Sequence, residues 1–259
     1  MAKKLHFFTI AISITLNCHA QWQLSKEIAL PKNPVAYSTD GSGNLYFGYQ
    51  DGSLVKYDPL GKELLNYSLS NQSTITLIEP QFQLRTFLFY FDNQLITVLD
   101  RFNTVPKSYP VRDFTSEIVL LACPAPDGSF WIIENNLLVL KRIDPNRKTL
   151  ILETQPSLGR DIRFMKAYQN ILLILDEKAL HIFDQFGGLL FRIDVESNHL
   201  TLENDKIYLL SKDEILVIDP FKGEILSREE SYVKGSDRFL KSKYISIYVK
   251  GKKLFLYQE

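Results

Sequence analysis

The chain has 259 residues, its 30 Lys and Arg residues are balanced by 30 Asp and Glu residues, and 45% of its side chains are hydrophobic. Balanced charge argues against a general attraction to nucleic acid, and this length is enough for one large apolar core or two small ones. Two cysteines, Cys18 and Cys123, are too few for a disulfide framework.

The first twenty residues have the order of features that is typical of a secretory signal peptide. Lys3 and Lys4 precede an apolar stretch from Phe7 to Leu16, and the small residue Ala20 ends the segment. The apolar stretch is too short to cross a bilayer. We therefore expect cleavage after Ala20 and export to a bacterial periplasm. A lipoprotein cleaved before Cys18 and a buried N-terminal helix are the alternatives.

Removal of that segment leaves residues 21–259, which are slightly acidic and contain no further apolar stretch that predicts a transmembrane segment. Cys123 is then the one remaining cysteine, so no internal disulfide is expected. Stability must come from an apolar core, and we expect residues 21–259 to form a single domain.

Residues 21–259 contain an internal repeat. Six short runs open with aromatic or branched apolar residues, and their starts lie 36 to 43 residues apart, at Asn44, Thr86, Ser129, Asn170, Lys206 and Tyr244. A period near forty is the length expected of a four-stranded propeller blade. Around each run we find an earlier apolar segment, a second strand after a polar break and, in most units, a third strand after a turn.

These units predict an all-β fold, namely a six-bladed β-propeller with four strands in each blade. No segment shows a sustained helical period with caps at both ends. The sixth unit ends near Gln258 without an outer strand, whereas the segment from Trp22 to Leu30 has no blade of its own. We expect this segment to pair with the last unit and close the ring, because an open ring leaves strand edges that invite aggregation.

An aspartate followed by a turn ends one strand in five of the six units. Such a carboxylate accepts backbone N–H groups two residues on, and the glycines at Gly61, Gly187 and Gly223 supply the positive φ that the turns need. A ring of carboxylates could also suggest a metal site, but turn formation explains them better. The five predicted turn residues are Asp58, Asp100, Asp144, Asp184 and Asp219.

Two stretches carry a family resemblance. "DGSGNLYFGYQDGSLVKYDPLGKELL" from Asp40 and "PDGSFWIIENNLLVLKRIDPNRK" from Pro126 resemble blades of bacterial six- and seven-bladed propellers of the NHL, quinoprotein-repeat and two-component-sensor types. The resemblance implies the fold and leaves activity open. The tryptophan-rich docking motif of quinoproteins is absent, since residues 21–259 hold only Trp22 and Trp131. Size and export segment are similar to those of the periplasmic plug subunit of the type 9 secretion translocon.

Residues 21–259 are poor in catalytic side chains. His181 and His199 form no paired metal motif, and no G-x-S-x-G nucleophile elbow occurs. Cys123 lies in an apolar strand, where a buried inert thiol is expected. We therefore expect neither an enzyme nor a bound metal or cofactor.

Two other functions stay open. A calcium-dependent lactonase-like or sugar-acting enzyme would hold its metal on the propeller axis, with Glu117, Asp161 and Asn198 as candidates. A sensor of a small ligand would need aromatic residues lining an axial pocket, and Tyr90, Phe91 and Tyr168 are the candidates for that lining.

The leading hypothesis is a non-enzymatic exported scaffold, monomeric on its own, that binds another envelope protein, such as a secretion-system or outer-membrane assembly component. The irregular segment Phe102 to Phe114 predicts a distorted outer strand or a loop, and Pro106 and Tyr109 are candidate contacts there. A basic surface of the last blade is the other candidate contact, although exposed lysines also protect strand edges. Its residues are Lys234, Arg238, Lys241, Lys243, Lys250, Lys252 and Lys253.

Overall fold

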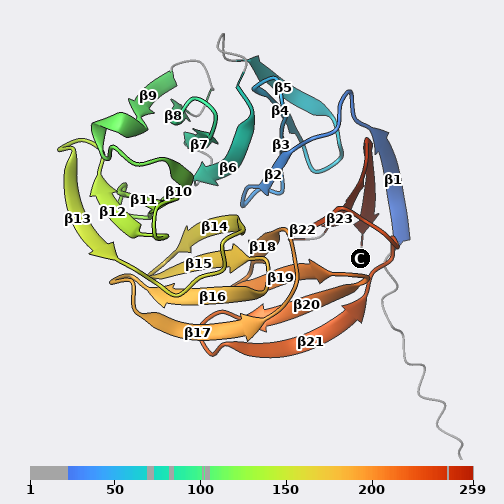
Figure 1. Ribbon diagram of the computed structural model, residues 1–259. Helices are drawn as coiled ribbons and strands as arrows, with labels where there is room; N and C mark the ends of the chain where they lie inside the picture. The colour runs from blue at the N-terminus through green and yellow to red at the C-terminus, as the bar shows by residue number, and fades with distance from the viewer. Residues whose placement is uncertain are drawn as a thin grey trace, which may run out of the picture.

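The computed structural model describes residues 23–68, 73–81, 85–100, 102, 106–243 and 245–258. The predicted signal peptide therefore lies outside the described residues. Six four-stranded antiparallel sheets are arranged as blades around a central axis, which confirms the predicted six-bladed β-propeller (Figure 1). One short 3₁₀ helix, η1 (Val111–Asp113), is the only helical element in the described part of the chain.

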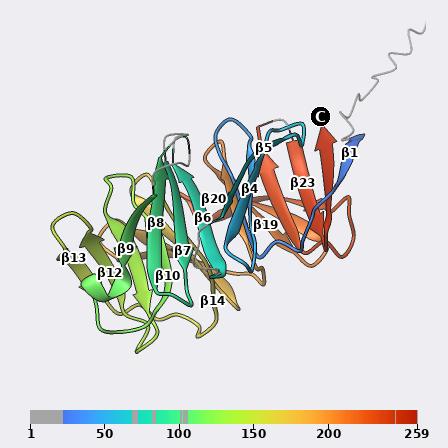
Figure 2. The same cartoon turned by 90° about the horizontal axis from the view of Figure 1, so that it is seen from above.

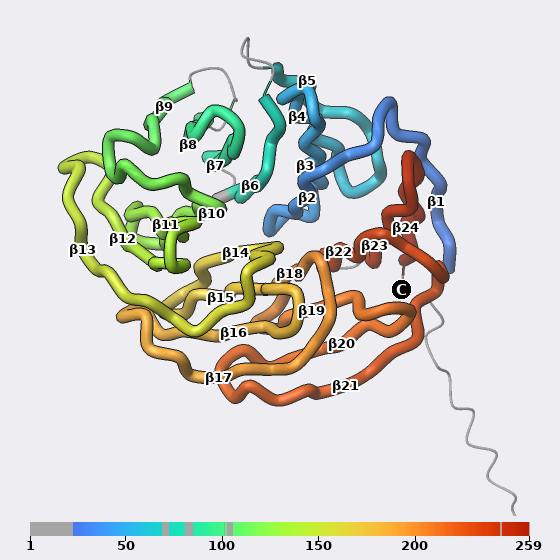
Figure 3. The backbone as a smooth tube through the Cα atoms, viewed as in Figure 1, coloured from blue at the N-terminus to red at the C-terminus, as the bar shows by residue number. Residues whose placement is uncertain are grey.

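In blades 1 to 5 the strands follow one another outward from the axis in chain order, and in blade 6 the N-terminal strand β1 lies outside β24 (Figure 3). Blade 1 contains β2 (Ala36–Thr39), β3 (Leu45–Gly48), β4 (Ser53–Tyr57) and β5 (Glu63–Ser68); blade 2 contains β6 (Ile75–Gln81), β7 (Arg85–Tyr90), β8 (Leu95–Asp100) and β9 (Pro106–Pro110); blade 3 contains β10 (Val119–Pro124), β11 (Phe130–Glu134), β12 (Leu140–Asp144) and β13 (Thr149–Thr154). Blade 4 contains β14 (Ile162–Tyr168), β15 (Ile171–Asp176), β16 (Ala179–Asp184) and β17 (Leu189–Asp194); blade 5 contains β18 (Leu200–Glu203), β19 (Lys206–Ser211), β20 (Glu214–Asp219) and β21 (Glu224–Glu230); blade 6 contains β22 (Arg238–Ser242), β23 (Ile245–Lys250), β24 (Lys253–Gln258) and β1 (Gln23–Ala29).

The ring closes through the first and last strands of the chain. β1 pairs antiparallel with β24, with Ile28 opposite Leu254 and Glu27 opposite Phe255, so the N-terminal strand is the outer strand of blade 6. The two termini of the described chain consequently lie together (Figures 1 and 2). The predicted closure is confirmed, and it leaves blade 6 with the four strands of its neighbours.

The core lies between the blades. Phe87 of blade 2, Trp131 of blade 3 and Phe183 of blade 4 are buried members of one apolar cluster, and a second cluster joins blades 1 and 6. The two middle strands of a blade are covered on both faces, which explains near-continuous apolar runs such as Ile171–Asp176, a strand that is buried throughout. No helix among the described residues has the length and apolarity needed to cross a membrane.

The aspartate turns form as their sequence pattern predicts. The Asp58 carboxylate accepts backbone N–H groups from Leu60 and Lys62 at 2.9 and 2.8 Å. Asp144, Asp184 and Asp219 accept equivalent backbone bonds in their own turns. Gly61, Gly187 and Gly223 have φ of 75°, 79° and 69°, as predicted. Residue 101 lies outside the described residues, so a turn role for Asp100 stays a prediction.

The outer strand of blade 2 corrects an expectation. The two prolines in Phe102–Phe114 predicted distortion, yet β9 pairs with β8 in unbroken register from Leu95 opposite Pro110 to Leu99 opposite Pro106. Prolines are tolerated here because Pro106 and Pro110 are the two ends of an edge strand. Residues 103–105 lie outside the described residues.

A buried carboxylate ties together the hairpin of blade 4. Asp176 accepts backbone N–H groups from Gly159, Lys178 and Ala179 at 2.7, 2.8 and 2.8 Å, and its Oδ2 lies 2.7 Å from Nε2 of His181. Burial raises the pKa of the Asp176 carboxyl, but these hydrogen bonds outweigh burial, and the pKa lies below its ordinary value. His181 is thus a strand residue of the blade interior, as its alternation with apolar residues predicts.

Replacing Asp176 tests this role. A depressed pKa in the folded state contributes stability above the unfolded-state pKa of about 4, and that contribution is lost as pH falls through the lower folded-state pKa. We expect Asp176→Asn to lower the free energy of unfolding at pH 7 by about 2 kcal/mol, because several bonds to a charged acceptor weaken. We also expect it to flatten the decline in stability below about pH 5. Urea unfolding across this pH range measures both effects.

The matched control is Asp194→Asn in the same blade, because the Asp194 side chain is 75% exposed and pairs with Arg192 on the surface. Exposed pairs of this kind contribute about 0 to 1 kcal/mol. Equal losses of stability in the two variants, or equal pH dependence, would contradict the assigned role of Asp176.

Candidate functional site

The six inner strands, β2, β6, β10, β14, β18 and β22, surround the propeller axis (Figures 1 and 3). Because every blade is built in the same order, their first residues gather at one end of the axis and their last residues at the other. A pocket lies at each end. A third pocket lies between blades 2 and 3.

The arginine pocket lies where the inner strands of blades 4, 5 and 6 begin, and it has a volume of about 500 Å³. Arg163 extends into it from β14 and Arg238 from β22, while Asn198 and His199 come from the segment before β18. The same four residues also line a small axial cavity next to it, where Tyr37 of β2 joins them. Charged and polar groups from four blades thus meet on the axis.

The two arginines are held by main-chain oxygens. Arg238 donates to the carbonyl of Asp237 at 2.7 Å, and its guanidinium lies 5.6 Å from the centre of the Tyr37 ring. Arg163 donates to the carbonyl of Ser197 at 3.0 Å and to the Asp161 carboxylate at 3.0 Å. Burial lowers the pKa of the Arg238 guanidinium, and the positive charge of Arg163 lowers it further. Tyr37 and Asp237 act in the opposite direction and raise it.

His199 is a buried polar side chain of the arginine pocket. It is 8% exposed and lies edge-on to Phe164, with ring centres 4.6 Å apart. Burial, together with the positive charges of Arg238 and Lys166, lowers the pKa of His199 to about 3. The imidazole is therefore neutral at physiological pH.

The Tyr168 pocket lies at the opposite end of the axis, where the inner strands finish, and has a volume of about 770 Å³. Lys166 and Glu79 form an ion pair at 2.5 Å in its wall, and the second carboxylate oxygen of Glu79 is buried without a hydrogen-bond partner among the described residues. Burial raises the pKa of Glu203, and nearby Lys241 and Lys243 oppose this rise.

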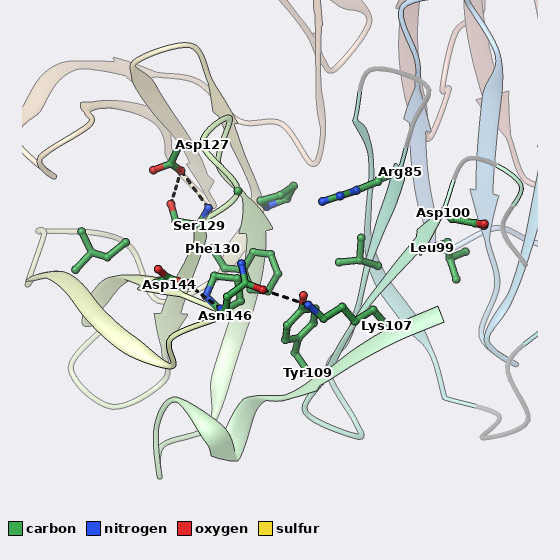
Figure 4. A pocket seen from close by; sticks show the side chains of 15 residues that line it. Arg85, Leu99, Asp100, Lys107, Tyr109, Asp127, Ser129, Phe130, Asp144 and Asn146 are labelled. Atoms are coloured by element: carbon green, nitrogen blue, oxygen red, sulfur yellow. Dashed lines mark hydrogen bonds between the residues drawn. The ribbon is translucent and has the colours of Figure 1, made fainter. Parts of the chain in front are cut away.

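The third pocket, of about 530 Å³, lies between blades 2 and 3 (Figure 4). Arg85 extends from β7 toward blade 3, and Lys107 of β9 donates to the side chain of Asn146 at 3.1 Å. Tyr109 packs edge-on against Phe130, with ring centres 5.3 Å apart. Neither a histidine nor a cysteine lines this pocket. Its charged and polar side chains suit the binding of a polar partner.

The predicted contact residues are distributed over several surfaces. Tyr109 is half-buried between blades 2 and 3, and Pro106 is exposed at the start of β9. The predicted basic surface is divided, because Lys241 and Lys243 lie at the end of β22 toward the Tyr168 pocket, whereas the other five residues lie near the opposite end of blade 6. Two of its lysines are ion-paired, Lys234 with Glu230 and Lys253 with Glu27. Arg238 belongs to the arginine pocket.

The candidates for an axial calcium ion are not brought together. Asn198 lines the arginine pocket. Glu117 and Asp161 are exposed and line none of the three pockets, and the Asp161 carboxylate is paired with Arg163. Among the described residues, no three His, Cys, Asp or Glu side chains are grouped to hold a metal ion. Cys123 is fully buried, and burial raises the pKa of its thiol, as expected of an inert cysteine.

The predicted aromatic lining of an axial pocket was correct only for Tyr168. Its side chain lines the pocket named after it, and its hydroxyl donates to the Asp205 carboxylate. Tyr90 lies instead in an apolar cluster of blades 1 and 2, and Phe91 is in the turn after β7, 38% exposed. Tyr90 is the last residue of β7, the second strand from the axis, and neither residue lines a pocket on the axis.

The sequence did not predict that Arg163 and Arg238 line the same pocket, and it did not predict the role of the Asp40 carboxylate. The buried Asp40 carboxylate accepts bonds from Ser42, Asn44 and the Tyr46 hydroxyl, and so organises the first hairpin. Its signal in the sequence is the Asp-Gly-Ser repeat, which recurs at Asp127, where the carboxylate also pairs with an arginine. No local signal joins the two axial arginines, because the blades bring them together.

Comparison with known proteins supports the fold alone. No family model and no curated protein sequence matches this chain. Among solved structures, virginiamycin B lyase from Staphylococcus aureus superposes with a TM-score of 0.64 and 11% identity over 92% of this chain and 100% of the lyase chain. The β-propeller domain of Cps50 (Swd1) from Myceliophteria thermophila superposes with a TM-score of 0.66 and 10% identity over 92% of this chain and 100% of that domain. A chain of the Mitotic Checkpoint Complex superposes with a TM-score of 0.62 and 9% identity over 100% of this chain and 99% of the other.

Proposed function

We propose that this protein is a non-enzymatic scaffold that is exported to the cell envelope and binds another envelope protein through the outer rim of its ring. One repeated feature of the outer strands carries the proposal. In five blades the outer strand contains a β-bulge, a residue that has no partner opposite, and in four of these the bulged residue is an exposed aliphatic side chain. These residues are Leu64, Ile151, Leu190 and Leu226.

Three of the bulges lie on consecutive blades and extend the apolar surface. In β13, β17 and β21 the residue before the bulge is aliphatic too, and all six side chains are between 38% and 55% exposed: Leu150, Ile151, Leu189, Leu190, Ile225 and Leu226. These strands follow one another along the outer edge of the ring (Figure 3). We call these six residues the aliphatic rim. Repeated exposed apolar surface of this kind is typical of a site that another protein covers.

Neighbouring turns hold the aliphatic rim in place. A side chain at Gly187, in the turn before β17, would come within 2.6 Å of Thr154 in β13. One at Gly223, in the turn before β21, would come within 2.5 Å of Phe191 in β17. Each outer hairpin is thus packed tightly on the preceding blade. The rim is therefore a preformed surface, which lowers the ordering cost of binding.

The bulges also indicate how the partner is bound. A bulge interrupts the regular edge of a strand and discourages another strand from pairing with it. Binding through backbone hydrogen bonds at these edges is therefore disfavoured, and the partner would contact aliphatic side chains. Scaffold use of a propeller has precedent among the structural neighbours, since one of them is a chain of the Mitotic Checkpoint Complex. A secretion-system or outer-membrane assembly component is the kind of partner we propose.

Capture from native envelope extracts tests the rim. We expect the wild-type protein to recover a stoichiometric partner and the triple variant Ile151→Lys, Leu190→Lys, Leu226→Lys to lose it by about tenfold or more, because three exposed contacts are replaced by charges. All three positions are exposed, so the fold should tolerate lysine there. Thermal unfolding confirms that the variant is folded.

The matched control is a double lysine variant on the opposite part of the ring, at Leu24 and Leu60, which are 51% and 64% exposed and are not bulged residues. This control should retain the partner. Failure of the wild-type protein to recover any stoichiometric partner, or equal recovery by the rim variant and the control variant, contradicts the proposal. Variants of Pro106 and Tyr109, and of the basic residues of blade 6, test the other proposed contacts in the same assay.

The alternative function, a calcium-dependent enzyme with an axial metal site, is tested separately. Binding of calcium to the folded state alone would raise the melting temperature. We expect the melting temperature to be indifferent to added calcium and to a chelator. A clear rise in melting temperature with calcium would favour the enzyme instead, provided that Asn198→Ala abolishes the rise and the control variant Asn136→Ala does not.

A further inference from the structure

We propose that the arginine pocket binds a small carboxylate anion on the propeller axis, between the guanidinium groups of Arg163 and Arg238. The site is independent of the aliphatic rim and is not required for the proposed scaffold function. Its volume of about 500 Å³ lies within the range of small-molecule sites. The proposal depends on three features of the pocket, namely the two guanidinium groups that meet in it, their unused N–H donors and the groups at its mouth.

The charge comes from Arg238. This side chain is largely buried, and the Tyr37 and Asp237 side chains offset the effect of burial only in part. Its contacts with the Asp237 carbonyl and the Tyr37 ring use few of the five N–H donors of a guanidinium. A buried charge that is neutralised only in part is costly, and an anion bound beside it would lower that cost.

Arg163 adds a second guanidinium from the neighbouring side. Its Nε and Nη1 are used by Asp161 and Ser197, which fix its orientation, and the remaining Nη2 donors are directed by this anchoring. Arg163 lies near enough to Arg238 that the repulsion between the two positive charges lowers the pKa of Arg238. Two like charges placed together in one pocket favour an anion between them, and the planar fork of arginine matches a carboxylate.

His199 supplies the floor of the site. The side chain is more than nine-tenths buried and lines both the pocket and the adjoining axial cavity. A neutral imidazole can donate one hydrogen bond, and a carboxylate oxygen would accept it. Asn198 beside it offers two further N–H donors.

The mouth of the pocket restricts the ligand. Glu196, Asp237 and Lys212 lie there, and both acids are exposed. Two carboxylates at the entrance repel a ligand with several negative charges more strongly than a ligand with one. The site is therefore suited to a small monocarboxylate and less suited to phosphate or a polyanion.

Acetate is the probe, and the ring signals of His181 and His199 report binding by NMR on the full chain at constant ionic strength. We expect acetate to shift the His199 signals in a saturable way and to leave those of His181 unchanged, since His181 lies in the core of blade 4. Arg163→Gln and Arg238→Gln should each weaken acetate binding by about tenfold or more. Arg238→Lys should weaken it less, because the positive charge remains.

The matched control is Arg147→Gln, at a surface arginine whose side chain is 83% exposed. This variant should bind acetate as the wild type does. Shifts that grow linearly with acetate without saturating, equal effects of all the arginine variants, or saturation by inorganic phosphate in preference to acetate would each overturn the proposal. Thermal unfolding of every variant separates loss of the site from loss of the fold.

Discussion

The pairing of β1 with β24 is the constraint on which the rest of the structure depends. It joins the two ends of the described chain and gives blade 6 its outer strand. Without it, β24 would present an unpaired edge, and blade 6 would have three strands. Because this contact has the longest separation in sequence, its loop-closure entropy is also the largest. Everything placed on the axis relies on the ring being closed.

Closure has opposite consequences at the centre and at the periphery. At the axis it brings residues of different blades together, so that Arg163, His199 and Arg238 share a pocket although no two belong to the same strand. At the periphery every blade ends in an edge strand that closure cannot cover. In five blades a bulge interrupts that edge, and in four of them the bulged aliphatic residues give the ring an apolar outer surface. Edge protection and partner recognition can therefore reside in the same residues.

The sequence predicts what depends on local pattern. The repeat and the turn residues, such as Asp58 with Gly61, follow from strand alternation and from hydrogen bonds that span a few residues. It does not predict the axial site, because Arg163 and Arg238 meet only through the arrangement of blades. The expected place of Tyr90 was wrong because β7 is the second strand of its blade, so Tyr90 packs between blades 1 and 2 and the inner strand β6 faces the axis. The prolines of β9 predicted distortion that an edge strand does not require.

The most direct test of ring closure compares two shortened chains, one beginning at residue 22, which keeps β1, and one beginning at residue 32, which lacks it. If closure holds the ring together, the first chain is monomeric in size-exclusion chromatography and unfolds in a single cooperative transition. The second then associates through β24 or loses cooperative unfolding, and an added peptide of residues 22–31 restores both properties. A chain beginning at residue 32 that is monomeric and unfolds at the same temperature as the longer chain would contradict the account.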